Sequence, residues 1–272
     1  MTIPIERVRT DGFEMEYFRF GAGRRPLVIL PGLSVKSVMA SAQSVAGQYR
    51  GFTRDFTVWV FDRRLAPPQA LSIRQMAADQ AAAMRTLGLS DACLFGASQG
   101  GMVAMQLAVD APELVGKLAL SATAARVRPE SAAVLERWVR LAREKDREGL
   151  YLAFGEAIYP PDVFSAAREL LLTLAQDVTD DDLERFVLLS AGSRNFDLLD
   201  RLTEIRCPVL VTASRDDGVL GVESTEQIAE QLADRPDFTC HLYDGCGHAV
   251  YDTAPDHPDR LLRFFTGLPP VD

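Results

Sequence analysis

The sequence contains neither a hydrophobic run long enough to cross a membrane nor a cluster of lysine or arginine residues. Its 272 residues carry a formal net charge of −9, which disfavours binding to nucleic acids and to anionic membrane surfaces. Residues 1–9 lack the apolar segment of a secretory signal, so we expect a cytoplasmic protein. These absences favour a small molecule as the binding partner, and they leave the oligomeric state open.

Residues that commonly form disulfides or hold metal ions are also scarce. The four cysteines include no C-x-x-C pair, and three of them lie in or beside predicted strands, so we expect free thiols. The acidic run from Asp180 to Glu184 is typical of the first turn of a helix, where the helix dipole favours carboxylates. We therefore predict neither a metal site nor a cofactor.

Short apolar runs alternate with helical patterns through most of the chain. This order predicts an α/β fold: a mostly parallel sheet with helices on both faces. The alternation stops at Arg126, and only helical periodicity follows up to about residue 199. We therefore predict one α/β core, residues 1–126 and 200–272, into which residues 127–199 are inserted as a helical cap.

The expected elements follow from apolar runs, helical periodicity and capping residues. Strands are predicted at residues 14–20, 27–30, 57–61, 92–95, 117–121, 209–212 and 238–243, the first of them at an edge of the sheet. Helices are predicted at residues 37–50, 72–87, 98–110, 131–144, 147–157, 164–175, 179–189, 224–232 and 258–265.

A serine between glycines connects one of these strands to the next helix. Residues 92–95 are apolar throughout, Gly96-Ala97-Ser98-Gln99-Gly100 follows, and residues 102–109 suit a helix packed against the sheet. The serine hydroxyl in such a sharp turn projects away from the backbone, and the residues two positions before and after it must be nearly free of side chains. Ser98 is therefore the predicted nucleophile.

A serine nucleophile needs a base that takes its proton. The sequence has three histidines. His241 lies within a predicted strand and His257 at a helix start, whereas His248 follows a strand and a glycine-containing loop. A loop at the carboxyl edge of the sheet is the place for a catalytic base, so we predict that His248 has this role.

The base in turn needs a carboxylate that orients it. The loop after the strand at residues 209–212 contains Asp216 and Asp217, whereas the loop after residues 117–121 contains no carboxylate. Asp-Asp-Gly is also an ordinary turn sequence. The residues by themselves leave Asp216 and Asp217 as alternatives for the acid.

With these residues the chain resembles the α/β-hydrolase fold superfamily, in particular its small serine esterases and haloperoxidase-like enzymes. The order Ser98, aspartate, His248 is the order of that fold, and the resemblance covers nearly all of residues 14–266. In relatives the acid often stands three residues after a glycine at the strand end. Ser214 occupies that glycine position here, so the resemblance favours Asp217.

The resemblance also implies an oxyanion hole made by the backbone N–H groups of Leu33 and Gln99. Two such donors stabilise the negative charge of a tetrahedral intermediate, and removing one typically costs about 2.7–4 kcal/mol. The sequence departs from the family at two loops. Pro31-Gly32 stands where relatives often have His-Gly, and residues 64–68 replace a glycine-rich loop.

Together these features predict a serine hydrolase that cleaves a small, largely apolar carboxylic ester or lactone through an acyl-enzyme. C–C bond or thioester hydrolysis by the same residues is the enzymatic alternative. A slowly hydrolysing sensor of a small ligand is the alternative of another class. We expect Trp138 and Tyr159 in the cap to line an apolar pocket above Ser98. Arg126 is a candidate contact for a substrate carboxylate, although an exposed arginine explains it as well.

Overall fold

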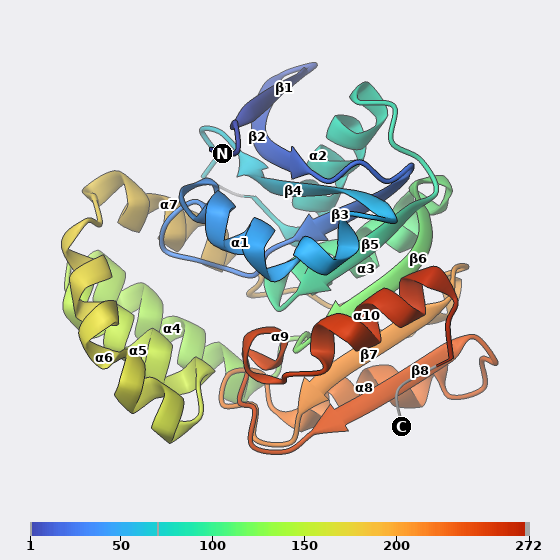
Figure 1. Ribbon diagram of the computed structural model, residues 1–272. Coiled ribbons are helices and arrows are strands. Elements are labelled where there is room, and N and C mark those ends of the chain that lie inside the picture. Colours follow the sequence, from blue (N-terminus) through green and yellow to red (C-terminus); the bar gives the residue numbers. More distant parts are fainter. Residues whose placement is uncertain (1, 70, 270–272) are drawn as a thin grey trace.

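The computed structural model describes residues 2–69 and 71–269. A β-sheet forms its centre, and helices lie on both sides of it (Figure 1). The strands are β1 (Glu6–Thr10), β2 (Phe13–Phe20), β3 (Arg25–Leu30), β4 (Phe56–Arg64), β5 (Ala92–Ala97), β6 (Val115–Ser121), β7 (Val209–Ser214) and β8 (Phe238–Tyr243).

The eight strands form one sheet in the order β1-β2-β4-β3-β5-β6-β7-β8. β1 and β2 form an antiparallel hairpin, β2 pairs antiparallel with β4, and all other neighbours are parallel. Every residue of β5 and of β7 is buried, as expected for parallel strands covered on both faces. This buried centre gives the loops at the carboxyl ends of β5 and β7 a rigid base.

The α-helices are α1 (Ala42–Gln48), α2 (Ile73–Thr86), α3 (Gln99–Asp110), α4 (Pro129–Arg143), α5 (Arg147–Ile158), α6 (Pro161–Gln176), α7 (Asp180–Ala191), α8 (Val222–Leu232), α9 (Val250–Thr253) and α10 (His257–Thr266). Short 3₁₀ helices span Val38–Ser41, Arg50–Phe52, Pro112–Leu114 and Leu199–Glu204. One face of the sheet carries α1 and α10, and the other carries α2, α3 and α8 (Figure 1). No helix in the described ranges is long and apolar enough to cross a membrane.

The prediction of an α/β fold with a mostly parallel sheet is confirmed, and every predicted strand is present. The prediction that residues 14–20 form an edge strand is wrong, because β1 covers β2 and forms the edge itself. β1 is short and charged, and only Val8 is buried in it. Ion pairs from Arg7 to Glu14 and Glu16 hold it to β2 instead of an apolar face, so its sequence has no clear strand pattern.

Two helical segments also differ from the prediction. The single helix expected at residues 37–50 is divided into a 3₁₀ turn, the short helix α1 and a second 3₁₀ turn. α9 has four residues, which is too short for a periodic pattern to show in the sequence.

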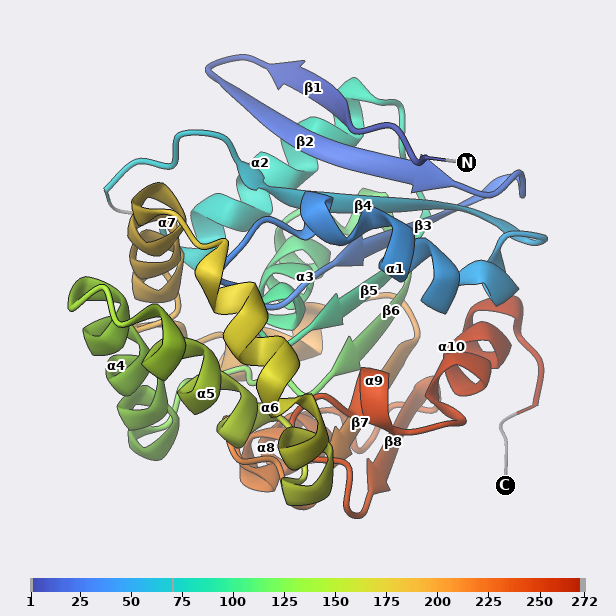
Figure 2. The ribbon, with the colours of Figure 1, turned by 60° about the vertical axis from the view of Figure 1, so that its left-hand side comes forward.

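The inserted helices α4–α7 lie between β6 and β7 in the chain, inside the segment predicted to be the cap. Figure 2 shows them beside the carboxyl ends of the parallel strands. Trp138 of α4 packs on Phe154 of α5, with ring centroids 4.4 Å apart. In contrast, Ala175 is the sole buried residue of α6 among those described, and Leu170 is 60% exposed. The cap therefore has a small core of its own and one loosely covered helix.

Candidate active site

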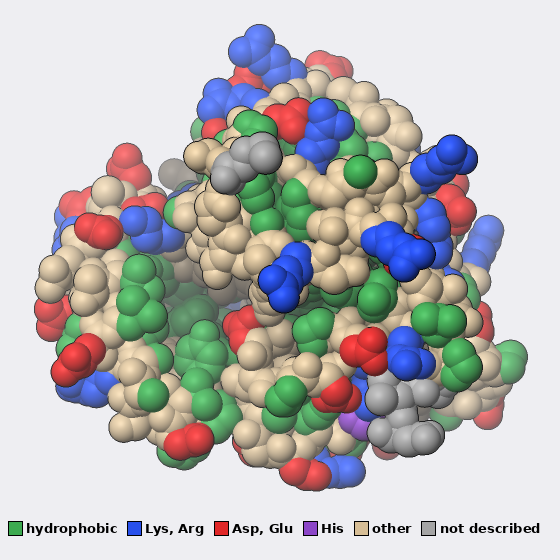
Figure 3. Space-filling view, viewed as in Figure 1, with side chains coloured by type: hydrophobic (Ala, Val, Ile, Leu, Met, Phe, Trp, Pro, Cys, Tyr) green, Lys and Arg blue, Asp and Glu red, His purple; other side chains and the backbone are tan. Residues whose placement is uncertain are grey.

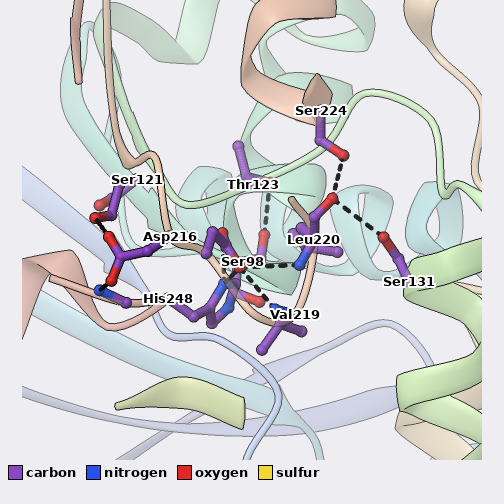
Figure 4. Close-up of polar contacts among 12 residues, drawn as sticks. Ser98, Ser121, Thr123, Ser131, Asp216, Val219, Leu220, Ser224 and His248 are labelled. Carbon is purple, nitrogen blue, oxygen red and sulfur yellow. Dashed lines mark hydrogen bonds and ion pairs between the residues drawn. The ribbon is translucent and has the colours of Figure 1, made fainter. Parts of the chain in front are cut away.

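Ser98 lies at the sharp turn between β5 and α3. Its backbone has φ 50° and ψ −121°, a left-handed conformation that costs a residue with a side chain about 1–3 kcal/mol. The Ser98 N–H donates to the Ser121 carbonyl at 2.9 Å, and the Thr123 hydroxyl donates to the Ser98 carbonyl at 2.7 Å (Figure 4). These contacts hold the strained turn, so the hydroxyl is presented at the end of the strand.

The glycines around Ser98 are required by the close packing of α3. A Cβ on Gly100 would lie 2.0 Å from the Leu30 carbonyl oxygen of β3. A Cβ on Gly96 would lie 2.5 Å from the Gly100 carbonyl oxygen. Because backbone atoms occupy both places, the helix can start here only without these side chains.

His248 follows β8 and contacts the carboxylate of Asp217 in the loop after β7. Its Nδ1 lies 2.9 Å from each carboxylate oxygen of Asp217, and both side chains are almost fully buried. The N–H groups of Val219 and Leu220 donate to Asp217 Oδ1 at 2.8 and 2.9 Å. Burial by itself would raise the pKa of Asp217, but His248 and these two amides hold that pKa below its usual value.

Asp216, the other predicted candidate for the acid, has different contacts. Its carboxylate accepts hydrogen bonds from the Gly245 N–H at 3.0 Å, the Gly247 N–H at 3.1 Å and the Ser214 hydroxyl. Asp216 therefore shapes the loop that leads to His248, whereas Asp217 contacts the ring itself.

Ser98 and His248 line the same cavity, which has a volume of about 50 Å³. Leu33, Gln99 and Trp138 also line it. A hydrogen bond between a nucleophile and its base often tightens only when substrate binds, so the shared cavity is the relevant geometry in the free protein. Within residues 2–69 and 71–269, no group of three or more His, Cys, Asp or Glu side chains is arranged to hold a metal ion.

The two predicted oxyanion donors flank the serine. A Cβ on Gly32 would lie 3.2 Å from Ser98 Cβ, so the loop that carries the Leu33 amide passes directly over the serine. The Gln99 amide is the first N–H of α3, and the first amides of a helix have no acceptor within it. Both backbone segments therefore meet at Ser98, as the predicted oxyanion hole requires.

Comparison with known proteins assigns the chain to a family. Residues 27–264 match the family model described as the Alpha/beta hydrolase family. The chain belongs to this family.

Relatives of this α/β hydrolase have several activities in their names. The RutD protein of Caulobacter segnis, named as a carbamate hydrolase, is 27% identical over 255 residues, which cover 90% of this chain and 93% of RutD. A 2-hydroxy-6-oxononadienedioate/2-hydroxy-6-oxononatrienedioate hydrolase of Burkholderia vietnamiensis is 30% identical over 193 residues, or 68% of this chain and 65% of that protein. The enol-lactonase of Burkholderia xenovorans LB400 has the same fold, with a TM-score of 0.82 at 19% identity over 96% of this chain and 100% of the lactonase.

A larger cavity of about 410 Å³ adjoins the one at Ser98. The two share Gly32, Leu33, Phe154, Ile158 and Tyr251. Figure 3 shows a hollow with hydrophobic side chains between the cap helices and the core of the hydrolase.

The three residues predicted to bind substrate lie in three different places. Trp138 lines the small cavity and Tyr159 lines the large one. Arg126 lies instead at the base of the cap, where its Nε pairs with Asp197 Oδ2 at 2.6 Å and the two residues form a β-bridge. This ion pair joins the two ends of the insertion, and it explains the charge of Arg126 without a substrate carboxylate. Arg126 lines neither cavity.

Sequence reasoning missed a polar network behind the loop that carries Leu33. Arg63 at the end of β4 is 6% exposed, and its Nη2 donates to the Pro31 carbonyl at 2.9 Å. The adjacent Asp62 accepts hydrogen bonds from Ser37 and from Arg185 of α7. These partners lie far apart in the chain, and a strand ending in charged residues was the only signal in the sequence.

Another serine of the hydrolase lies in contact with another histidine, away from Ser98. His257 Nε2 lies 3.4 Å from Ser121 Oγ and 3.0 Å from Thr212 Oγ1, and all three residues are buried. Burial lowers the pKa of His257 to about 3, so this ring is neutral in the folded protein at ordinary pH.

Proposed function

We propose that this hydrolase cleaves a small, largely apolar carboxylic ester or lactone through an acyl-enzyme on Ser98. The observation that carries the proposal is that His248, oriented by the buried carboxylate of Asp217, lines the same cavity as Ser98. A serine, a histidine and a carboxylate in these roles are the parts that acyl transfer needs.

The proposed reaction has two halves. Ser98 Oγ attacks the carbonyl carbon while His248 Nε2 takes its proton, and Asp217 holds the Nδ1–H tautomer and stabilises the imidazolium. The Leu33 and Gln99 amides stabilise the oxyanion. His248 then gives the proton to the leaving oxygen. In the second half His248 takes a proton from a water molecule as its oxygen attacks the acyl carbon. The bond from that carbon to Ser98 Oγ then breaks while His248 returns the proton to Oγ, which releases the acid and the free serine.

The walls of the cavities support an apolar substrate. Met102, Val219 and Leu220 line the small cavity, and the large one is also lined mainly by apolar and aromatic side chains. Binding sites of this kind use a few polar groups for orientation and apolar contacts for affinity. Thioester and C–C bond hydrolysis use the same catalytic residues and are enzymatic alternatives.

Carbamate hydrolysis is the second candidate function. It is favoured by the similarity to RutD proteins, which extends over 90% of the chain in one of them. A carbamate differs from an ester by a nitrogen on the carbonyl carbon, so the same attack and the same oxyanion hole serve both. Comparing turnover of an ester and a carbamate that share one alcohol decides between the two substrates.

A fluorophosphonate probe tests the nucleophile directly. We expect intact-protein mass spectrometry to show one adduct on the wild type, peptide mapping to place it on Ser98, and Ser98→Ala to remain unlabelled. Ser121→Ala is the matched control and should label like the wild type. A folded wild-type protein that stays unlabelled would refute the serine-hydrolase proposal. A labelled protein without sustained turnover of any ester, lactone, thioester or carbamate would favour the ligand sensor.

A further inference from the structure

The two cavities that meet at the reacting centre are very unequal. The cavity at Ser98 and His248 measures about 50 Å³, and its neighbour measures about 410 Å³. They join along a shared wall that includes Leu33 and Tyr251. A substrate whose carbonyl lies at Ser98 therefore has one small space and one large space for its two sides.

The small cavity has room for only a few atoms. A single water molecule needs roughly 10–15 Å³ of comparable volume, so this space holds about three to five non-hydrogen atoms. Its walls resist expansion because they are fixed by hydrogen bonds as well as by packing. The Trp138 indole N–H donates to the Ala153 carbonyl at 3.2 Å, and the Leu220 carbonyl accepts from Ser131 at 3.2 Å and Ser224 at 2.7 Å (Figure 4).

The large cavity is of the size that small-molecule sites usually have. Tyr49, Tyr151, Tyr159 and Tyr251 line it, together with Leu171 and Leu174 of α6. α6 is the most exposed helix of the cap, so this wall yields more easily than the wall around Trp138.

We propose that the substrate is strongly asymmetric about its reacting carbonyl. On one side the carbonyl carries a group no larger than methyl, amino or methoxy, and on the other side it carries a bulky apolar group that fills the large cavity. The proposal rests on the proposed function, because it assumes that the reacting carbonyl lies at Ser98. It adds the size and polarity of each end of the substrate.

Three isomeric esters test the asymmetry at constant composition and polarity. In octyl acetate the acyl part is the small one, and in methyl nonanoate the alcohol part is the small one. In pentyl pentanoate neither part is small. Forcing an extra methylene or more into a closed pocket typically costs 10- to 200-fold in kcat/KM. We expect one or both asymmetric esters to exceed pentyl pentanoate by at least about tenfold.

The outcomes distinguish this proposal from the proposed function. Equal kcat/KM for all three isomers would overturn the asymmetry while leaving the esterase in place. Hydrolysis of none of them by a protein whose Ser98 still reacts with fluorophosphonate would overturn the ester substrate class and, with it, this proposal.

A variant of the small cavity gives a second test. Leu135 lines the small cavity and a separate cavity of about 80 Å³, but not the large one, so Leu135→Ala should enlarge the small cavity and leave the large one unchanged. We expect the rate on pentyl pentanoate to rise relative to the better asymmetric ester by about three- to tenfold. Leu170→Ala is the matched control, because this leucine is 60% exposed and lines neither cavity. An unchanged ratio in a Leu135→Ala protein with a normal melting temperature would contradict the proposal.

A separate observation concerns Arg63. Its guanidinium donates to the Pro31 carbonyl at 2.9 Å and lies 3.5 Å from Gln99 Oε1. Pro31 precedes the loop with the Leu33 amide, and Gln99 provides the other amide. One buried cation therefore contacts both chain segments that carry the predicted oxyanion donors.

The structure assigns Arg63 the role of a positioning residue for the oxyanion hole. Both hydrogen bonds are donated by Nη2, which the rigid guanidinium holds at one place between the two acceptors, whereas a lysine ammonium sits on a flexible stem. The Gln99 side chain is held from the other side, because its Nε2 donates to the Leu189 carbonyl at 2.8 Å and to Ser193 Oγ at 3.0 Å. Arg63 therefore acts through the positions of the backbone amides and does not touch the reacting atoms.

Arg63→Met tests this role. We expect kcat to fall about 10- to 100-fold with KM nearly unchanged, because the oxyanion forms only during the reaction. A trifluoromethyl ketone, which forms an oxyanion on the serine, should bind more weakly by a similar factor, and Arg63→Lys should recover only part of the loss. Arg64→Met is the matched control, because Arg64 pairs with Asp79. Unchanged kcat and inhibitor affinity in Arg63→Met, even with a lower melting temperature, would overturn the assignment.

Discussion

The two serine–histidine pairs of this hydrolase lie near adjacent strand ends, yet their surroundings are opposite. Ser121 and His257 are in direct contact, 3.4 Å apart, but both are at most 1% exposed. Ser98 and His248 line a cavity, and Ser98 is only partly buried. Contact between a serine and a histidine is therefore no sign by itself that a substrate can reach them.

The difference lies in what stabilises a positive charge on each ring. His248 faces the carboxylate of Asp217, which can stabilise an imidazolium. His257 Nε2 faces the hydroxyls of Ser121 and Thr212, and burial holds its pKa at about 3. A base that cannot hold a proton near neutral pH cannot serve acyl transfer. Ser98 and His248 therefore suit the proposed reaction better than the buried pair does.

The largest expected effect is the loss of activity when the Ser98 hydroxyl is removed, and removal of the Ser121 hydroxyl is its comparison. Ser98→Ala should lower kcat by about 10⁶, as loss of the nucleophile does in a serine protease. Ser121→Ala should stay within about threefold, since it removes a hydrogen bond that does not touch the cavity. Steady-state kinetics on any accepted ester measures both variants. A severe loss of activity in a stable Ser121→Ala protein would break the comparison.

The next effect separates the two adjacent aspartates. Asp217→Asn should lower kcat by about 10⁴, because an amide favours the wrong tautomer of the histidine. Asp216→Asn should stay within about tenfold, because its contacts are to Ser214 and to the amides of Gly245 and Gly247. Near-normal turnover in Asp217→Asn would transfer the role of the acid to Asp216.

Thr123 connects the surroundings of Ser98 with those of Ser121. It follows β6, the strand that ends at Ser121, and its hydroxyl donates a hydrogen bond to the Ser98 carbonyl. Thr123→Val keeps the shape and loses this hydrogen bond, which contributes about 0.5–1.5 kcal/mol to the strained turn. We expect kcat to fall about three- to tenfold with an unchanged pH profile. The same fall should appear in the rate of labelling by fluorophosphonate. A Thr123→Val enzyme with wild-type rates would show that the Ser121 carbonyl and the glycines hold Ser98 without this contact.

The smallest effect is on stability and depends on pH. His257 is neutral when folded, but in the unfolded chain it takes up a proton near its usual pKa of about 6.5. The unfolded state therefore binds more protons as pH falls from 7 to 5, and the free energy of unfolding should fall by about 2 kcal/mol from this group. Urea unfolding at pH 7 and at pH 5 measures the free energy of unfolding of the wild type and of His257→Gln. An equal change in this free energy between the two pH values in both proteins would contradict the prediction.

Much of the fold followed from local pattern. The continuous apolar runs of β3, β5 and β7 predicted buried parallel strands, and the glycines around Ser98 predicted a turn too tight for side chains. These patterns are reliable because burial on both faces and close backbone approach each restrict the residues at a position. β1 was not predicted because its side chains contact β2 through ion pairs, and it has no apolar face that a sequence pattern would show.

The sequence alone thus determined the order of the seven predicted strands and the turn at Ser98, and it selected His248 as the candidate base. The residues by themselves left Asp216 and Asp217 open and the resemblance favoured Asp217, which the structure places against His248. The tertiary structure alone paired Arg126 with Asp197 and divided the cavity into unequal parts. The reason is distance along the chain. Asp217 and His248 are 31 positions apart, and Asp62 and Arg185 are 123 apart. A side chain's direction at such a meeting point depends on how several loops pack together, which no local pattern records.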